Sequence, residues 1–141
     1  MSRVYWDTLW FVSIQQAHPQ FGPLVRQAYG AILQRNDTRC TSVFTIGAML
    51  TLPKREKNDA VIQATRKYML DGEVEVLPFT LNTAEIYSEV RSYTRLRPAD
   101  AIHLASATEA GARLLVTDDD QLKKVGMAGI PTIVGLDGKI W

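Results

Sequence analysis

The sequence is poor in the features that mark secreted and membrane proteins. It contains a single cysteine, Cys40, so no disulfide can form within the chain. Cys40 lies in a short apolar run, and neither His18 nor His103 stands in a recognisable pattern with it, which favours a packed thiol over a catalytic one. No stretch approaches the roughly 18 consecutive apolar residues of a membrane helix, and no basic segment followed by an apolar one opens the chain. We therefore expect a cytoplasmic protein with no membrane partner.

The chain also lacks a large excess of charge of either sign. Lysine and arginine number 16, aspartate and glutamate 15, and the formal net charge is +1. A protein that holds nucleic acid mainly through a basic surface needs clustered cations, and we interpret the one such cluster, Arg91, Arg95 and Arg97, as a solvated helix face. The absence of a glycine-rich phosphate loop argues against an NTPase or a dinucleotide-dependent enzyme. With 46% apolar and 22% charged residues, the composition suits one globular domain over residues 1–141.

Strand-like and helix-like patterns alternate along the chain. Short β-prone runs predict strands at Arg3–Trp6, Arg39–Thr41, Val74–Leu77, Leu114–Val116 and Thr132–Val134. Helical spacing predicts helices at Leu9–Ile14, Phe21–Leu33, Ser42–Pro53, Asn58–Leu70, Asn82–Tyr93 and Pro98–Gly111, with Ser42 and Asn82 as caps and Pro53 as a helix end. A turn is expected at Asp137-Gly138. This alternation predicts a single α/β domain with a mostly parallel central sheet of four to five strands and helices on both faces.

Aspartates follow two of the predicted strands directly. Asp7 comes after the first strand, and Asp118, Asp119 and Asp120 come after the fourth. Because ligand sites of open α/β sheets form outside the carboxyl ends of the strands, these acids should lie at one edge of the sheet. Asp100, in the first turn of the last predicted helix, joins them if that helix begins at the same edge. Each acid alone is as well explained by a turn or a helix cap, so it is their co-location that points to a site.

Carboxylates crowded together repel one another unless a cation joins them. Mg²⁺ or Mn²⁺ is the natural occupant, because hard cations prefer oxygen ligands and keep several waters. Such a cation can polarise a phosphodiester and lower the pKa of a bound water. The arrangement of Asp7, Asp100 and Asp119 therefore predicts metal-assisted phosphodiester hydrolysis.

Four segments of the chain together resemble the signature of the PIN-domain family. The segments occur in the family's order, and the resemblance covers Arg3 to Val134, with the VapC-type toxins as the most similar subgroup. The most specific pieces are the Asp100-Ala-x-His-x-Ala segment and the Thr-x-Asp segment. The four segments are Tyr5-Trp6-Asp7-Thr8, Thr41-Ser42-x-x-Thr45, Pro98-Ala99-Asp100-Ala101-Ile102-His103-Leu104-Ala105 and Thr117-Asp118-Asp119.

This resemblance implies an Mg²⁺- or Mn²⁺-dependent endoribonuclease, the toxin of a type II toxin–antitoxin pair, which cleaves structured RNA such as tRNA or rRNA. It also implies a homodimer that a small cognate antitoxin protein silences. Matched residue by residue, the family's catalytic and metal-binding acids fall on Asp7, Asp100 and Asp119. Asp118 falls on a position that assists the metal, and Thr8 and Thr117 are the supporting hydroxyls.

The sequence departs from the family pattern at Ala48. After Ser42 and Thr45 the pattern usually carries a glutamate at this place, and alanine cannot bind a metal. Losing one of four carboxylates weakens the binding of the metal and lowers the rate of the reaction that the metal assists. Either the chain has diverged into a weak or inactive nuclease, or the alanine was introduced to disable a toxic enzyme, or Asp118 or Asp120 compensates. The alternative function is a non-cleaving PIN-like module that binds RNA or an antitoxin.

Other features have a structural explanation beside a functional one. His103, three residues after Asp100 on the same helical face, is better explained as a hydrogen-bonded structural histidine than as a metal ligand. Trp6, Trp10 and Phe11 could stack on bases, but an apolar run beside the first strand more often packs as core or dimer surface. A phosphoacceptor receiver domain would need a second acid after the first strand and a lysine after the last strand, and the sequence supplies neither.

Overall fold

A five-stranded parallel sheet forms the centre of the computed structural model, which describes residues 2–17 and 19–136. The order of strands across the sheet is β3-β2-β1-β4-β5, and each pair of neighbours is parallel. The predicted α/β class is thereby confirmed, and the turn expected at Asp137-Gly138 lies outside the described residues. The strands are β1 (Arg3–Trp6), β2 (Thr38–Ser42), β3 (Glu75–Leu77), β4 (Leu114–Val116) and β5 (Thr132–Val134).

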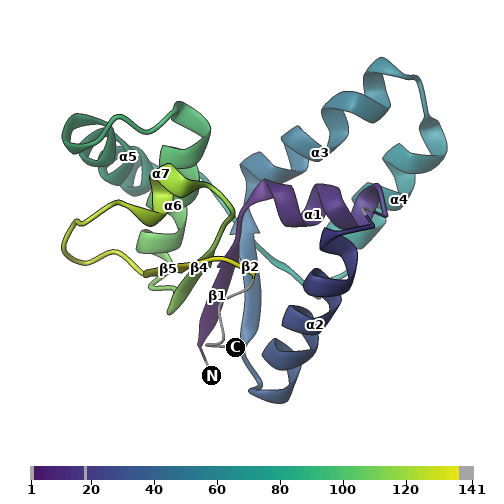
Figure 1. The fold of residues 1–141 in the computed structure, drawn as a ribbon. Helices are drawn as coiled ribbons and strands as arrows, with labels where there is room; N and C mark the ends of the chain where they lie inside the picture. The colour runs from purple at the N-terminus through teal and green to yellow at the C-terminus, as the bar shows by residue number, and fades with distance from the viewer. Residues whose placement is uncertain (1, 18, 137–141) are drawn as a thin grey trace.

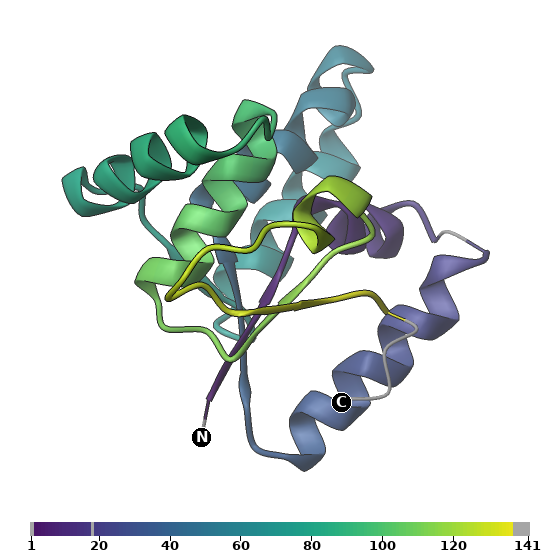
Figure 2. The ribbon, with the colours of Figure 1, turned by 60° about the vertical axis from the view of Figure 1, so that its left-hand side comes forward.

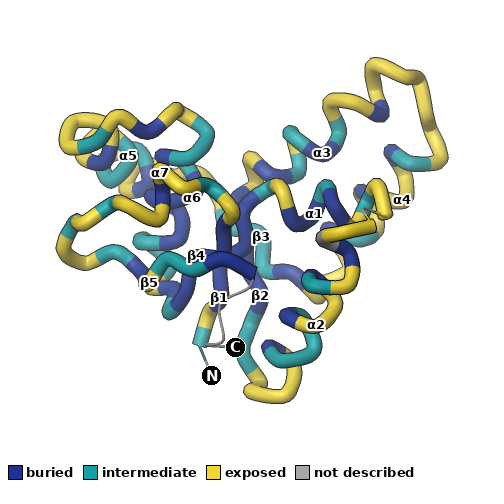
Figure 3. Tube along the Cα trace, viewed as in Figure 1, coloured by how far each residue is buried: buried dark blue, intermediate teal, exposed yellow. Residues whose placement is uncertain are grey.

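Helices cover both faces of this sheet (Figure 1). One face carries α1 (Thr8–Gln15), α2 (Phe21–Gln34), α3 (Val43–Arg55) and α4 (Asp59–Leu70), and the other carries α5 (Leu81–Tyr93), α6 (Pro98–Glu109) and α7 (Asp120–Lys123). In the turned view, α5 and α6 again lie side by side (Figure 2). The strands β1 and β4 are buried, whereas the junction of α3 and α4 is exposed (Figure 3). None of the described helices is long and apolar enough to cross a membrane.

Alternation along β1 sends its side chains into two separate cores. Trp6 packs with Trp10 and Phe11 beneath α1 to α4. These three side chains are buried, which confirms them as core residues, and each contributes roughly 1.5–3 kcal/mol to folding by leaving water. Tyr5 faces the core beneath α5 and α6 together with Cys40. Burial raises the pKa of the Cys40 thiol to about 12, as expected of a packed cysteine.

The prediction that Pro53 ends its helix was wrong, because α3 continues through Pro53 to Arg55. A proline inside a helix leaves the carbonyl four residues earlier without its usual N–H donor. Here that carbonyl belongs to Met49, and it accepts a hydrogen bond from Gln15 Nε2 at 3.1 Å instead. A side chain of α1 thus replaces the bond that Pro53 cannot make.

Two further boundaries differ from the prediction. The cap of α5 is Thr80, which forms a capping box with Thr83, so that Asn82 lies inside the first turn rather than before it. The short helix α7 was not predicted. It begins because the Asp119 side chain accepts hydrogen bonds from two backbone N–H groups of that helix.

Candidate active site

The acids that follow β1 and β4 meet at the carboxyl edge of the sheet. Asp7 directly follows β1, Asp119 caps α7 after β4, and Asp100 lies in the first turn of α6. Together with Asp118 they line one pocket of about 460 Å³. The structure therefore brings together the four acids predicted to form the site, although their roles stay predictions. The other lining residues are Thr8, Leu9, Phe44, Ala48, Arg97, Ala99 and His103.

Asp7 is a buried acid with one unpaired oxygen. Its Oδ2 accepts a hydrogen bond from the Thr117 hydroxyl at 2.6 Å, whereas Oδ1 is buried without a hydrogen-bond partner. Burial raises the pKa of Asp7 to about 7. The hydrogen bond from Thr117 and the nearby backbone N–H of Leu9 oppose this rise, and the charges of Asp100 and Asp119 add to it. An unpaired buried carboxylate oxygen is destabilising on its own and is the kind of group that a cation would satisfy.

Arg97 supplies positive charge to two of the acids. Its Nε donates to Oδ2 of Asp100 at 3.1 Å, and its Nη2 donates to Oδ2 of Asp119 at 3.0 Å. Burial raises the pKa of Asp100, although the bond from Arg97 opposes that rise. Burial would also raise the pKa of Asp119, but two backbone N–H groups of α7 and the Arg97 guanidinium hold it below its ordinary value. Arg97 thus neutralises part of the charge that a metal ion would otherwise neutralise.

The interpretation of Arg91, Arg95 and Arg97 as a solvated helix face was wrong for Arg97. Its side chain is 76% exposed, yet it bonds to two acids. It also lies outside a helix, at the N-cap position of α6, whereas Arg91 stays on α5 and bonds to the Tyr87 hydroxyl. Arg97 is the site residue that the sequence analysis missed. Its spacing of three residues before Asp100 was the pattern that would have indicated it.

A line of hydrogen bonds runs beneath the pocket and fixes the donor at each step. The Thr41 hydroxyl donates to the carbonyl of Trp6 at 2.8 Å, so the 2.8 Å bond between Thr41 and Thr45 must be donated by Thr45. Thr45 then accepts from the Thr8 hydroxyl at 3.3 Å. Thr8 in turn accepts from Nε2 of His103 at 3.0 Å. The predicted supporting hydroxyl of Thr8 is therefore held from both sides.

This order of donors defines the state of His103. Burial lowers the pKa of His103 to about 4, so the ring is neutral, and with its proton on Nε2 its Nδ1 is an acceptor. Nδ1 takes the hydroxyl proton of Tyr5 at 2.7 Å, while the Tyr5 oxygen accepts from the Ser42 N–H at 3.0 Å. Both ring nitrogens are hydrogen-bonded within the protein. His103 is thus a structural histidine, as predicted, and it positions Thr8.

Thr117, the second predicted hydroxyl, joins two of the acids. It donates to Asp7 and accepts from the backbone N–H of Asp119 at 3.0 Å. Oδ1 of Asp119 accepts from the backbone N–H of Gln121 at 2.7 Å and of Leu122 at 3.2 Å. The start of α7 therefore fixes Asp119, and Thr117 links that start to Asp7.

Ala48 lines the pocket and supplies no oxygen to it. Two acids were considered as replacements for the missing glutamate. Asp118 lines the same pocket and is exposed. Asp120 is exposed, lies 3.9 Å from Lys123 and is not among the pocket's lining residues, so it is not placed to compensate.

The oxygen ligands of these acids suit a hard divalent cation, although the side chains line one pocket without surrounding a common point. Within residues 2–17 and 19–136, no three acidic, histidine or cysteine side chains are already placed to hold a metal together. The fit rests on the unpaired Oδ1 of Asp7 and on the pKa of Asp7, which burial raises and the charges of Asp100 and Asp119 raise further. Carboxylate oxygens are the ligands that Mg²⁺ and Mn²⁺ prefer.

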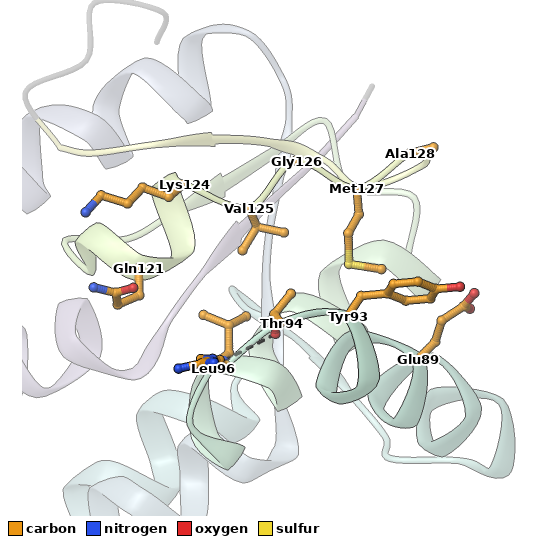
Figure 4. Close-up of a pocket in the computed structure, with 11 residues that line it drawn as sticks. Glu89, Tyr93, Thr94, Leu96, Gln121, Lys124, Val125, Gly126, Met127 and Ala128 are labelled. Carbon is orange, nitrogen blue, oxygen red and sulfur yellow. Dashed lines mark hydrogen bonds between the residues drawn. The ribbon is translucent and has the colours of Figure 1, made fainter.

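A larger cavity, of about 600 Å³, lies between the end of α5 and α7 (Figure 4). Glu89 and Tyr93 border it on the α5 side, and Gln121 and Lys124 border it on the α7 side. None of the predicted site residues lines it. The acids therefore line the smaller of these two pockets.

Comparisons with known proteins bear on the fold and the family of the chain. The family model of the PIN domain matches residues 4–127. VapBC2 from Rickettsia felis, solved bound to a DNA fragment from its promoter, is similar with a TM-score of 0.73 and 17% identity over 94% of this chain and 96% of that chain. A toxin–antitoxin complex from Klebsiella pneumoniae is similar with a TM-score of 0.73 and 21% identity over 94% of this chain and 97% of that chain.

A third similar structure is VapC20 of Mycobacterium tuberculosis, described as a sarcin–ricin loop cleaving toxin. It has a TM-score of 0.71 and 17% identity over 91% of this chain and 98% of that chain. No curated protein sequence matches the chain. At these identities the structural similarities establish the fold alone. The family model, however, spans most of the sequence and contains the acids of the pocket, and on that ground the chain belongs to the PIN domain family.

Proposed function

We propose that this chain is a divalent-metal-dependent endoribonuclease, the toxin of a type II toxin–antitoxin pair. The observation that carries the proposal is the pocket in which Asp7, Asp100 and Asp119 meet. A purely structural acid would have its oxygens paired locally, whereas Asp7 keeps a buried oxygen without a partner. Such destabilised acids in a cleft are typical of catalytic sites.

Mg²⁺ or Mn²⁺ is the proposed cofactor, with Asp7, Asp100 and Asp119 as the residues that would hold it and Asp118 assisting. When bound, such a cation polarises a phosphodiester and lowers the pKa of a water. The chain's own contribution is to fix the acids. Thr117 holds one oxygen of Asp7 and leaves the other unpaired.

Arg97 has a second proposed role, toward the substrate. Its guanidinium is exposed and can form two parallel hydrogen bonds to a phosphate. Release of one of its acids to a metal would free part of this donor set for the RNA backbone. Arg97 would then orient the phosphate next to the acids instead of neutralising them.

The proposed substrate is structured RNA such as tRNA or rRNA, and the proposed partners are a small cognate antitoxin and a second copy of the chain in a cytoplasmic homodimer. Similarity to the toxin–antitoxin complex of Klebsiella pneumoniae supports the antitoxin. Similarity to VapC20, described as cleaving the sarcin–ricin loop, supports RNA.

The proposal is tested by restoring the missing acid. Ala48→Glu should raise the rate of cleavage of a fluorogenic RNA in Mn²⁺ by about 10²-fold, the usual effect of one metal-positioning group. Ala48→Gln is the matched control, because it has the same size without the charge and should stay at the wild-type rate. A double variant, Ala48→Glu with Asp7→Asn, should lose the gain. Equal rates for the glutamate and glutamine variants would contradict the proposal.

A non-cleaving PIN-like module that binds RNA or an antitoxin is the second candidate, and Ala48 is the observation that favours it. This function predicts that the wild-type chain binds RNA in a salt-dependent manner and that neither it nor Ala48→Glu cleaves RNA in Mg²⁺ or Mn²⁺. Filter binding and the cleavage assay on the same preparations distinguish the two functions.

A further inference from the structure

Arg39, on β2, is a buried arginine without a polar partner. Its side chain is 2% exposed. Nε, Nη1 and Nη2 are all buried, and none of them has a hydrogen-bond partner. A guanidinium carries five N–H donors, and taking it out of water without acceptors is unfavourable. A group of this kind needs an explanation outside the ordinary packing of the core.

Four aromatic rings surround the Arg39 guanidinium. Its Cζ lies 4.1 Å from the ring centroid of Tyr29, 4.9 Å from Trp6, 5.5 Å from Phe11 and 5.6 Å from Tyr68. The faces of these rings stabilise the positive charge. Ring faces do not accept the N–H bonds with the strength or direction of an oxygen, however, so the cage retains the cation and leaves its donors unmet.

Arg39 is among the residues that line a cavity of about 250 Å³. The cavity is bordered by α1, α2 and α4, on the face of the sheet that Figure 1 shows on the right. Arg26 is a second cation in the lining, and no aspartate or glutamate is among the described residues that form it. The cavity shares no lining residue with the pocket of the acids. Two cations without a counter-ion favour an anionic ligand.

We infer that this cavity binds a small carboxylate whose two oxygens pair with the Arg39 guanidinium. A planar carboxylate matches the guanidinium fork with two parallel hydrogen bonds. Phosphate fits less well, because it has no apolar body to pack against the apolar and aromatic part of the lining. The Ser13 hydroxyl already donates to the Leu9 carbonyl at 2.8 Å. The remaining lining is largely apolar and aromatic, so the body of the acid should be apolar.

Benzoate is the probe that tests this inference, and benzamide is its neutral control of the same shape. In wild-type protein, sodium benzoate should shift the NMR resonance of the Arg39 Nε–H saturably and raise the melting temperature. Benzamide should bind about tenfold or more weakly, since it replaces the charge-assisted pair by neutral bonds. Chloride at equal ionic strength controls for salt. None of these measurements depends on a variant that folds.

Two variants localise the effect. Arg39→Met keeps the volume and the apolar contacts, and it should abolish stabilisation by benzoate. Arg26→Gln, at the exposed second cation of the cavity, should weaken binding far less. Three results would each overturn the inference: equal responses to benzoate and benzamide, tighter binding of inorganic phosphate, or an Arg39 resonance that no anion shifts. The third result would mean that the aromatic rings alone stabilise the buried guanidinium.

Discussion

Replacing Asp7 by asparagine should stabilise the metal-free protein at neutral and alkaline pH. Burial raises the pKa of the Asp7 carboxyl from 3.8 to about 7 in the folded chain, so the fold binds the proton more tightly than the unfolded chain does. The stability linked to this proton is present in full below about pH 4 and is lost as the pH rises toward 7. This difference between the two pKa values corresponds to about 4 kcal/mol in the free energy of unfolding.

Asparagine resembles the protonated acid and can still accept the hydrogen bond from Thr117. Asp7→Asn should therefore unfold at a higher urea concentration than wild type at pH 8 in EDTA, with a free energy of unfolding larger by up to about 4 kcal/mol. The free energies of unfolding of the two proteins should converge near pH 4. Burial lowers the pKa of His103, so the fold loses stability as the pH falls below 6.5. This effect is the same in both proteins and leaves the difference between their free energies of unfolding unchanged.

The same experiment can be repeated with Mn²⁺, and one result would contradict the prediction. Mn²⁺ at pH 8 should stabilise wild type and leave Asp7→Asn nearly unchanged, because the cation offsets the charge that burial penalises. If the urea midpoints of the two proteins run parallel from pH 4 to pH 8 without metal, Asp7 ionises as an ordinary carboxyl. The assignment of an unpaired, destabilised acid to this pocket would then be wrong.

Three other substitutions probe the surroundings of the acids. Arg97→Ala should leave the metal-free stability nearly unchanged, since the arginine is largely exposed, yet calorimetry should record tighter Mn²⁺ binding because a competing cation is gone. Tyr5→Phe strands the buried N–H of Ser42 and should cost about 1–3 kcal/mol in urea unfolding. Thr117→Val removes a bond that favours the ionised form of Asp7, and NMR titration should show the pKa of that carboxyl rising further.

The sequence was sufficient for features that depend on local pattern and on the rule for strand ends. Periodicity located the five strands, and the order of β1 and β4 in a parallel sheet placed Asp7 and Asp119 at one edge. Features that depend on distant partners were not predictable. The helix through Pro53 needs Gln15 from another helix, and the state of His103 depends on Tyr5, far away in the sequence.

Arg97 belongs to a different category, because its partners were predicted and only its rotamer was not. Sequence places a cation three residues before Asp100, where solvent and a nearby acid compete for it. The convergence of a second acid, Asp119, decides that competition in favour of the pocket. The short helix α7 was missed for a related reason: four residues carry too little periodicity, and the cap that starts them is itself a site residue.

The charges of the pocket indicate what Ala48 changes. When Asp7, Asp100 and Asp119 are ionised and Arg97 offsets one of their charges, one divalent cation would cancel the net charge of these four side chains. A glutamate at the position of Ala48 would leave one further negative charge, binding the metal more tightly and repelling the approaching phosphate more strongly. The alanine therefore weakens the hold on a cofactor while it lowers the electrostatic barrier to RNA. Loss of the fourth acid favours binding over cleavage. For that reason Ala48→Glu is the substitution that distinguishes the two proposed functions.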